Sequence, residues 1–321
     1  MNFRINSWVS RQTLTDHAKA QSVLNLCPGE IVEVRSANEV LATLDENGTL
    51  EGLPFMPEMR KYCGKRFKVQ NRFYKIMVEG VGIRRIKNTV SLEGVTCTGE
   101  AHSGCKRTCL ALWKEAWLKR VLNYSNTRQL SNYANISIND SKKLQNGIVS
   151  CQSVNLVKAT SNRHPIIWRI EQFLWEIKCR TLKPANYIRT LLSSLNLKAK
   201  NILVRKNQTI IQGKLRRTPT VSLNLQPGEL VEVKSKEEIL ATLDAKGRNR
   251  GLGFGAEMLK YCGKRYKVWK RVDIAINEET GTLRQINNTV LLEGVTCDGT
   301  AHGDCKRNCY CLWREIWLKR A

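Results

Sequence analysis

Two stretches of the chain carry the same alternation of apolar and polar residues, about 200 residues apart. Each begins with a Pro-Gly turn and an alternating run, EIVEV at residues 30–34 and ELVEV at residues 229–233. An alternation with a period of two predicts a half-buried β-strand. Further runs, first KRFKV and KRYKV and then NTVSLEGV and NTVLLEGV, predict more short strands. We therefore expect a small, curved antiparallel sheet in each stretch, with an SH3-like barrel as the candidate topology.

A short helix is expected after the first strand of each stretch. Ser36 is followed three residues later by Glu39, and Ser235 by Glu238. A serine and a glutamate at this spacing form a capping box, in which each side chain binds a backbone N–H at the helix start. The first such helix is expected near residues 37–44, and both helices are expected to end at a glycine-containing turn.

The two stretches define a duplication that covers residues 22–120 and 221–321. The offset between equivalent residues is 199 up to Arg72 and 200 from Asn88 onward, so the extra residue falls in a loop or hairpin turn. The expected organisation has four parts: an N-terminal extension at 1–21, repeat 1 at 22–120, a basic linker at 121–220 and repeat 2 at 221–321. The expected fold class is α+β, with two similar small domains, each a curved sheet plus a C-terminal helix.

The C-terminal helix of each domain is predicted from the spacing of large residues. Cys105, Cys109, Trp113 and Trp117 are each four residues apart, which places them on one face of a helix. Glu115 and Lys119 are then i,i+4 partners on its surface. The same spacing recurs in the second repeat.

The linker divides into two parts. Residues 121–160 are rich in Asn and Ser and are expected to be flexible. Residues 164–200 show apolar positions at helical intervals after Pro165, which predicts a helical hairpin. We favour packing of this hairpin on one of the repeats. The alternative is a basic amphipathic helix at 164–180 that lies on a membrane or a nucleic acid.

Cysteine and histidine residues recur with one spacing in both repeats. Three cysteines and one histidine follow the pattern C-x4-H-x2-C-x3-C, and a further cysteine lies upstream in YCGKR. A tetrahedral zinc site requires four such ligands. We therefore predict a zinc ion in each repeat, held by four of five candidates, with an iron–sulfur cluster as the alternative. The candidates are Cys63, Cys97, His102, Cys105 and Cys109, and Cys262, Cys297, His302, Cys305 and Cys309.

The chain is strongly basic, with a formal charge of +25, of which +14 falls in residues 121–220. Such an excess favours an anionic partner: nucleic acid, an acidic protein or a charged membrane surface. Basic residues alternate with aromatic ones on one predicted strand of each repeat, a pattern that suits contact with a nucleic-acid backbone and base stacking, with a solvated strand face as the alternative. The candidates for anion binding are Lys65, Arg66, Lys68 and Arg72, and Lys264, Arg265, Lys267 and Arg271.

Motifs of the common enzyme classes are not visible in the sequence, so a non-enzymatic module that binds nucleic acid or an acidic protein is the favoured function. The alternative is a metal-dependent enzyme or accessory protein with an open metal position, in which Glu93, Glu100 or Glu293 transfers protons. A third reading is an adaptor whose two copies gain avidity. Neither a secretory signal nor an apolar run of membrane-spanning length is visible. We expect a cytoplasmic protein whose cysteines bind metal instead of forming disulfides.

Two blocks of the repeats, GLPFMPEM…YCGKR and LEGVTC…AH…C…C…W.E.WLKR, resemble short bacterial proteins of unassigned function that carry a single copy. The resemblance covers both repeats but not the linker, and it implies no activity. The second repeat departs from the pattern at Gly253, Gly255 and Ala256, where the first has Pro54, Met56 and Pro57.

Overall fold

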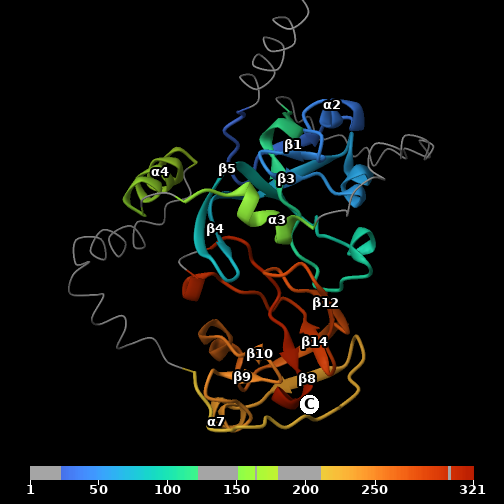
Figure 1. Cartoon of the computed structure of the whole chain (residues 1–321), viewed down its shortest axis with the longest axis vertical. Helices are drawn as coiled ribbons and strands as arrows, with labels where there is room; N and C mark the ends of the chain where they lie inside the picture. The colour runs from blue at the N-terminus through green and yellow to red at the C-terminus, as the bar shows by residue number, and fades with distance from the viewer. Residues whose placement is uncertain (1–22, 122–150, 163–164, 180–210, 303–304) are drawn as a thin grey trace, which may run out of the picture. The chain divides into compact units, whose positions relative to one another are not determined.

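The computed structural model describes residues 23–121, 151–162, 165–179, 211–302 and 305–321 (Figure 1). The chain forms two compact units. Unit 1 consists of Met1–Tyr74, Arg84–Val95 and Ala111–Arg163, and unit 2 consists of Lys75–Ile83, Thr96–Leu110 and His164–Ala321. Unit 2 therefore contains the second repeat and two segments of the first. The expected extension at 1–21, most of the Asn- and Ser-rich stretch and the second helix of the expected hairpin lie outside the described residues.

The first repeat is built mainly from short strands. Its elements are β1 Ile31–Val34, α2 Ala37–Leu41, β2 Thr49–Leu50, β3 Leu53–Pro54, η1 Pro57–Tyr62, β4 Arg66–Val78, β5 Gly82–Leu92, η2 Glu100–His102, β6 Trp113–Lys114, η3 Glu115–Trp117 and β7 Leu118–Arg120, where η marks a 3₁₀ turn. Five of the strands form an antiparallel sheet in the order β6-β5-β4-β1-β7. β1 thus pairs with the last strand on one side and with β4 on the other.

The second repeat has a sheet with corresponding order. Its elements are β8 Leu230–Val233, α7 Lys236–Leu240, β9 Arg248–Asn249, β10 Leu252–Gly253, η5 Ala256–Tyr261, β11 Arg265–Arg271, β12 Ile274–Ile276, β13 Leu283–Gln285, β14 Thr289–Leu292, η6 Thr300–His302, β15 Trp313–Arg314, η7 Glu315–Trp317 and β16 Leu318–Arg320. The sheet order is β15-β14-β11-β8-β16. The structure is therefore a mixture of helix and antiparallel sheet, as the α+β prediction requires.

Local sequence signals place several elements correctly. The strands expected at EIVEV and ELVEV are β1 and β8, and their valines face the core. Both capping boxes are present, with the Ser36 side chain accepting from the Glu39 amide and Ser235 doing the same for Glu238. The extra residue belongs to the second repeat, between Arg271 and Asn288, a segment that contains the β12–β13 hairpin. These predictions are confirmed because each depends on neighbours in sequence.

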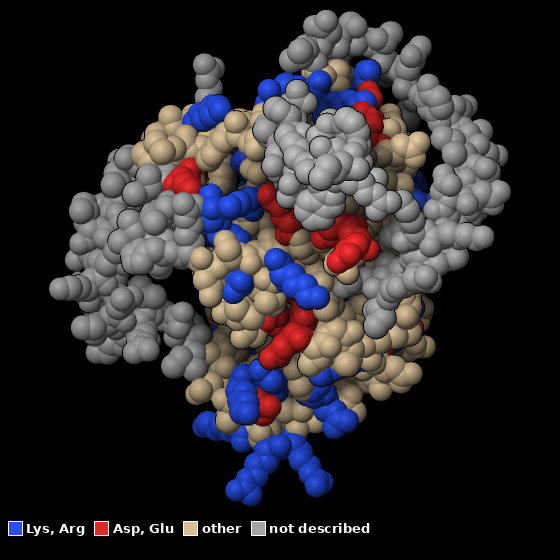
Figure 2. Space-filling view, turned by 45° about the horizontal axis from the view of Figure 1, so that its top comes forward, with Lys and Arg blue, Asp and Glu red and all other residues tan. Residues whose placement is uncertain are grey.

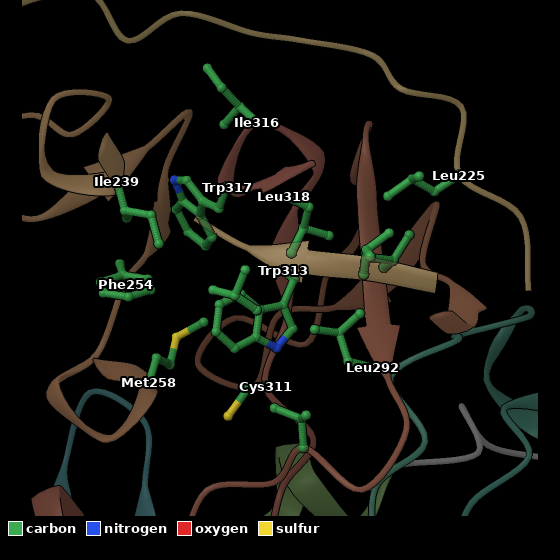
Figure 3. Packing of buried hydrophobic residues seen from close by; sticks show 14 of the residues in the cluster. Leu225, Ile239, Phe254, Met258, Leu292, Cys311, Trp313, Ile316, Trp317 and Leu318 are labelled. Carbon is green, nitrogen blue, oxygen red and sulfur yellow. The ribbon is translucent and has the colours of Figure 1, made fainter. Parts of the chain in front are cut away.

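The core of the second repeat forms around two tryptophans. Trp313 and Trp317 are fully buried, and Phe254 meets both rings edge to face, at centroid distances of 6.1 and 5.3 Å. Figure 3 shows both rings and Phe254 together with Met258, which comes from η5. Edge-to-face pairs of this kind add to the free energy gained by burying apolar surface. The same core holds η5 in place, and η5 also contains Glu257.

The C-terminal helix expected in each domain is not formed, and that prediction is wrong. Residues 105–112 are irregular, and Thr108, like its counterpart Asn308, has a positive φ of 53° or 45°, which an α-helix does not accommodate. Trp113 instead pairs with Val90 in the sheet. The four-residue spacing that predicted a helix arises because a strand and a 3₁₀ turn both direct a tryptophan into the core.

A buried carboxylate fixes that last turn in each repeat. The Glu315 side chain is fully buried and accepts hydrogen bonds from the amides of Leu223, Asn224 and Leu225, at 2.6, 3.0 and 3.1 Å. It also accepts from Arg271 Nη1 at 2.7 Å. A carboxylate can be buried when charge and hydrogen-bond donors surround it in this way.

The first repeat has the same arrangement. Glu115 accepts from the amides of Asn25 and Leu26, at 3.0 and 2.8 Å, and forms a buried ion pair with Arg72. The expected partner of Glu115 on a helix surface, Lys119, instead contacts Glu39. The i,i+4 pair is therefore also absent, because the backbone between the two residues is not helical.

Two helices of the linker are described. α3, Gln152–Ala159, was not expected, because residues 121–160 were predicted to be flexible; its Gln152 side chain binds the backbone of Leu112 and Pro54. α4, Pro165–Lys178, confirms the helix expected after Pro165. None of the described helices is long and apolar enough to cross a membrane.

We predict that Glu115→Gln lowers the free energy of unfolding of unit 1 by about 3 kcal/mol, because the buried Arg72 then loses the carboxylate that neutralises it. Urea unfolding followed by tryptophan fluorescence measures this loss. The control is Glu93→Gln, which removes a carboxylate from the exposed pair with Lys68 and should change stability by less than about 1 kcal/mol. Equal effects of the two substitutions would contradict the assigned role of Glu115.

Candidate metal centre

The residues best placed to hold an ion in unit 2 are Glu257, Cys297 and His302. One ligand atom from each lies within 4.8 Å of the others, and His302 Nε2 is 3.4 Å from a Glu257 carboxylate oxygen. All three side chains are partly buried. Thiolate, imidazole and carboxylate are the three side-chain ligands that zinc takes in proteins. The geometry therefore supports a metal site but does not identify the metal.

The loop between Cys297 and His302 is shaped by a glycine. Gly299 has a φ of 76°, and a Cβ at this position would lie 2.0 Å from the Cys305 carbonyl oxygen. The His302 amide donates to the Gly299 carbonyl at 2.9 Å, which closes the turn. A side chain at residue 299 would prevent this turn and move the imidazole away from the thiol.

Glu257 is supplied by η5, which is tied to the same loop. Lys260 Nζ lies 2.6 Å from the Asp298 carboxylate, and the Tyr261 hydroxyl donates to the Thr296 carbonyl at 2.7 Å. Glu257 and Lys260 belong to one 3₁₀ turn, so these contacts also hold the carboxylate beside His302. The Gly299 turn and the contacts of η5 therefore hold His302 and Glu257 in place in the absence of an ion.

Charge at the site favours a cation. Hydrogen bonds to the Cys297 thiol and the Glu257 carboxylate raise the pKa of His302 to about 10. The hydrogen bond from His302 in turn lowers the pKa of Glu257 below its usual value. Without an ion, a proton on the imidazole supplies the positive charge that the two acceptors attract. A metal ion can replace that proton, because it binds the same three groups.

The structure brings together two of the five ligand candidates in the second repeat. Cys297 and His302 are in the group, whereas Cys262, Cys305 and Cys309 are not members of it. Glu257 was missed, although a glutamate, Glu58, stands at the corresponding sequence position of the first repeat. The recurrence of a glutamate before Met59 and Met258 was the available signal.

The remaining cysteines of the pattern have other surroundings within unit 2. The Cys105 thiol accepts from the Ile276 amide at 3.4 Å, and the Cys305 thiol accepts from the Met77 amide at 3.3 Å. Each thiol therefore receives a hydrogen bond from the hairpin of the other repeat. Burial raises the pKa of the Cys309 thiol above its usual value. The burial and the hydrogen bonds of these thiols favour a role in packing.

An ion-pair cluster accompanies these cysteines. The Arg307 guanidinium binds both carboxylate oxygens of Glu278 at 2.7 Å, and both side chains are buried. Lys106 contacts Asp273 at 2.6 Å, and its amide donates to the Ile274 carbonyl at 2.9 Å. Residues 96–110 are thereby joined to β12, which explains why they belong to unit 2.

The upstream cysteines Cys63 and Cys262 each follow a 3₁₀ turn and are partly buried. Burial raises the pKa of both thiols, which disfavours the thiolate that a metal requires. The expectation that cysteines form no disulfides is wrong for Cys27 and Cys179, which are disulfide-bonded.

The candidates for anion binding fall into two classes. Arg72 and Arg271 form ion pairs with the buried carboxylates described above. Three others form exposed ion pairs: Arg66 with Glu33, Lys68 with Glu93 and Arg265 with Glu232. Lys65, Lys264 and Lys267 are exposed, and within the described part of the chain no ion pair involves them.

Comparison of the whole chain with known proteins finds no matching family model, curated protein or solved structure. The duplication supplies an internal comparison instead, because equivalent positions of the two repeats can be set side by side. Residues shared by both copies include the metal-ligand candidates and the buried glutamate. Residues that differ between them identify where the copies have diverged.

We predict that Cys297→Ser and His302→Ala each remove one bound ion per chain, because each deletes a ligand of a three-residue group. Elemental analysis of protein purified without chelator measures the ion content. The control is Cys262→Ser, which removes a candidate thiol outside the group and should leave the content unchanged. A loss of metal from the control alone would place the site elsewhere.

Proposed function

We propose that the protein is a non-enzymatic tandem binding module in which one metal ion in each repeat fixes the Cys/His loop, and that the module contacts nucleic acid. The observation that carries the proposal is the convergence of Glu257, Cys297 and His302 within 4.8 Å. Zinc is the favoured ion, because one thiol, one imidazole and one carboxylate form an ordinary ligand set for it. An iron–sulfur cluster is disfavoured, because it needs several thiolates and the group contains one.

Each repeat is inferred to be a small SH3-like domain. What supports this inference is the position of β1 and β8, each of which pairs with both the long strand and the final strand of its repeat. Pairing of the first strand with the last begins to close the sheet on itself. In such a domain the metal ion would join the loop from Cys297 to His302 to η5, the turn before the long strand.

Phosphate contact, without base stacking, is the proposed mode of binding. The aromatic residues between the basic ones, Phe67 and Tyr266, pack edge to face on Tyr62 and Tyr261, at 5.6 and 5.7 Å. Because these rings pack on tyrosines of their own repeat, we assign them no role in base stacking. The exposed lysines Lys264 and Lys267 are suited to the phosphate backbone, whose binding depends on charge and not on sequence.

A metal-dependent enzyme is the second candidate. Three protein ligands leave a position open for water, which is the arrangement of catalytic zinc sites. Among the carboxylates considered for proton transfer, Glu93 is paired with Lys68 at the surface. We therefore retain the binding module as the better-supported function.

We predict that a labelled oligonucleotide binds the metal-loaded protein and that the logarithm of the affinity falls linearly with the logarithm of the salt concentration. The double variant Lys264→Ala/Lys267→Ala should reduce the salt slope by about two, one unit for each lost phosphate contact. Fluorescence anisotropy over a salt series measures both quantities.

The matched control is Lys61→Ala/Lys158→Ala, which removes the same charge from exposed positions of the first repeat and of α3. Its slope should equal that of the unmodified protein. Absence of oligonucleotide binding at low salt would exclude nucleic acid as the partner, while the metal content would still report on the metal site.

A further inference from the structure

A hollow in unit 2 is lined almost entirely by arginine. Arg216, Arg217, Thr218 and Arg250 surround a space of about 540 Å³ that is open to solvent. The three arginines are exposed, and among the described residues no carboxylate forms an ion pair with them. Figure 2 shows lysine and arginine side chains gathered at the lower edge of the view, apart from most of the acidic ones.

The walls of the hollow are held in place by the backbone. Residues 211–220 run along the β9–β10 hairpin, and the Leu215 amide donates to the Leu243 carbonyl at 3.1 Å. The Asn249 side chain donates to the Pro219 carbonyl at 3.0 Å. The Arg250 amide donates to the Thr218 hydroxyl oxygen at 2.9 Å, which leaves the hydroxyl proton available to a ligand. The arginines therefore project from a fixed frame.

In the first repeat, the residue equivalent to Arg250 is a glutamate, Glu51, which neutralises a buried lysine. Lys114 is almost fully buried, and its ammonium group lies 2.7 Å from the Glu51 carboxylate. Burial lowers the pKa of Lys114, and Glu51 opposes that effect. Glu51 is thus the counter-ion of a basic residue on β6.

The second repeat keeps a basic residue on this strand but has a second basic residue in place of the counter-ion. Lys114 corresponds to Arg314, and Glu51 corresponds to Arg250. Arg314 Nη2 donates to the Arg250 carbonyl at 2.9 Å, and burial together with the Arg250 charge lowers the pKa of Arg314. The Arg314 Nε is buried and has no hydrogen-bond partner. Two guanidinium groups therefore stand where the first repeat has an ion pair.

The reversal extends along the hairpin. Residues 45–51 read DENGTLE and contain three carboxylates, whereas residues 244–250 read DAKGRNR and contain three basic residues and one carboxylate. That carboxylate, Asp244, accepts from the amides of Lys246 and Arg248 within its own turn, at 2.8 and 2.9 Å. The Asp244 carboxylate therefore binds amides of its own turn and does not neutralise the arginines of the hollow.

We propose that this hollow binds a phosphate group, which replaces the carboxylate that Glu51 supplies in the first repeat. Arginine is suited to this role because its planar fork binds two phosphate oxygens at once and stays charged when partly desolvated. The Thr218 hydroxyl adds a neutral donor. The proposal rests on the proposed nucleic-acid contact for its source of phosphate, which we take to be the nucleic-acid backbone.

The test is isothermal titration of the full-length protein with inorganic phosphate at low salt. The unmodified protein should bind phosphate saturably. Arg250→Gln should weaken binding at least about tenfold, because it removes a charge-assisted contact. Arg250→Glu, which restores the residue of the first repeat, should abolish binding. Arg217→Gln provides a second variant, and thermal unfolding verifies that each variant is folded.

The matched control is Lys246→Gln, which removes one positive charge from the same hairpin outside the hollow and should change the affinity less than about twofold. Equal losses in Arg250→Gln and Lys246→Gln would reduce the effect to net charge and overturn the proposal. Absence of saturable phosphate binding would overturn it as well.

A parallel titration with a labelled oligonucleotide separates this site from the proposed function. Weaker oligonucleotide binding by Arg250→Gln supports a nucleic-acid source. If phosphate binds but the unmodified protein ignores the oligonucleotide, the phosphate site stands and the proposed nucleic-acid contact fails. Vesicles containing phosphatidic acid then test a lipid headgroup as the source.

Discussion

The fold of each repeat depends on one buried carboxylate. Glu115 and Glu315 lie in the 3₁₀ turn before the last strand, where each accepts from consecutive backbone amides of the residues that lead into the repeat. An arginine from the long strand, Arg72 or Arg271, completes the set. One side chain thereby joins three segments that are distant in sequence. A buried charge of this kind is costly unless every partner is present, so the arrangement selects one backbone path.

That constraint also explains which sequence predictions succeeded. Capping boxes and alternating strands depend on neighbouring residues, and both are confirmed in the two repeats. The helix expected through Cys105 and Trp117 failed, because four-residue spacing does not distinguish a helix from a strand joined to a 3₁₀ turn. A carboxylate buried by long-range amides decides between them, and no local pattern reveals it. Arg72 was predicted to bind an anion for the same reason: its ion pair with Glu115 joins residues that are 43 apart in sequence.

The cysteines of the repeated pattern have two different roles. Cys297 and His302 meet Glu257 in a group that can hold an ion. Cys305, three residues further on, accepts a backbone hydrogen bond from Met77 and contributes to packing in unit 2. Sequence spacing suggested one site for all of these thiols, because ligands close in sequence can share an ion. The missing information was the path of η5, which brings a carboxylate to the loop from 40 residues upstream of Cys297.

Duplication gives the chain two copies of this frame, and the copies have diverged in charge more than in architecture. The buried glutamate, the capping box and the sheet order are kept in both. The hairpin after the first helix has changed from acidic to basic, although Arg250 retains the positive φ of Glu51, 48° against 50°. The backbone of this hairpin is therefore preserved while its electrostatic character is inverted. A change of side-chain charge on a shared frame alters what the surface attracts while the path of the backbone stays the same.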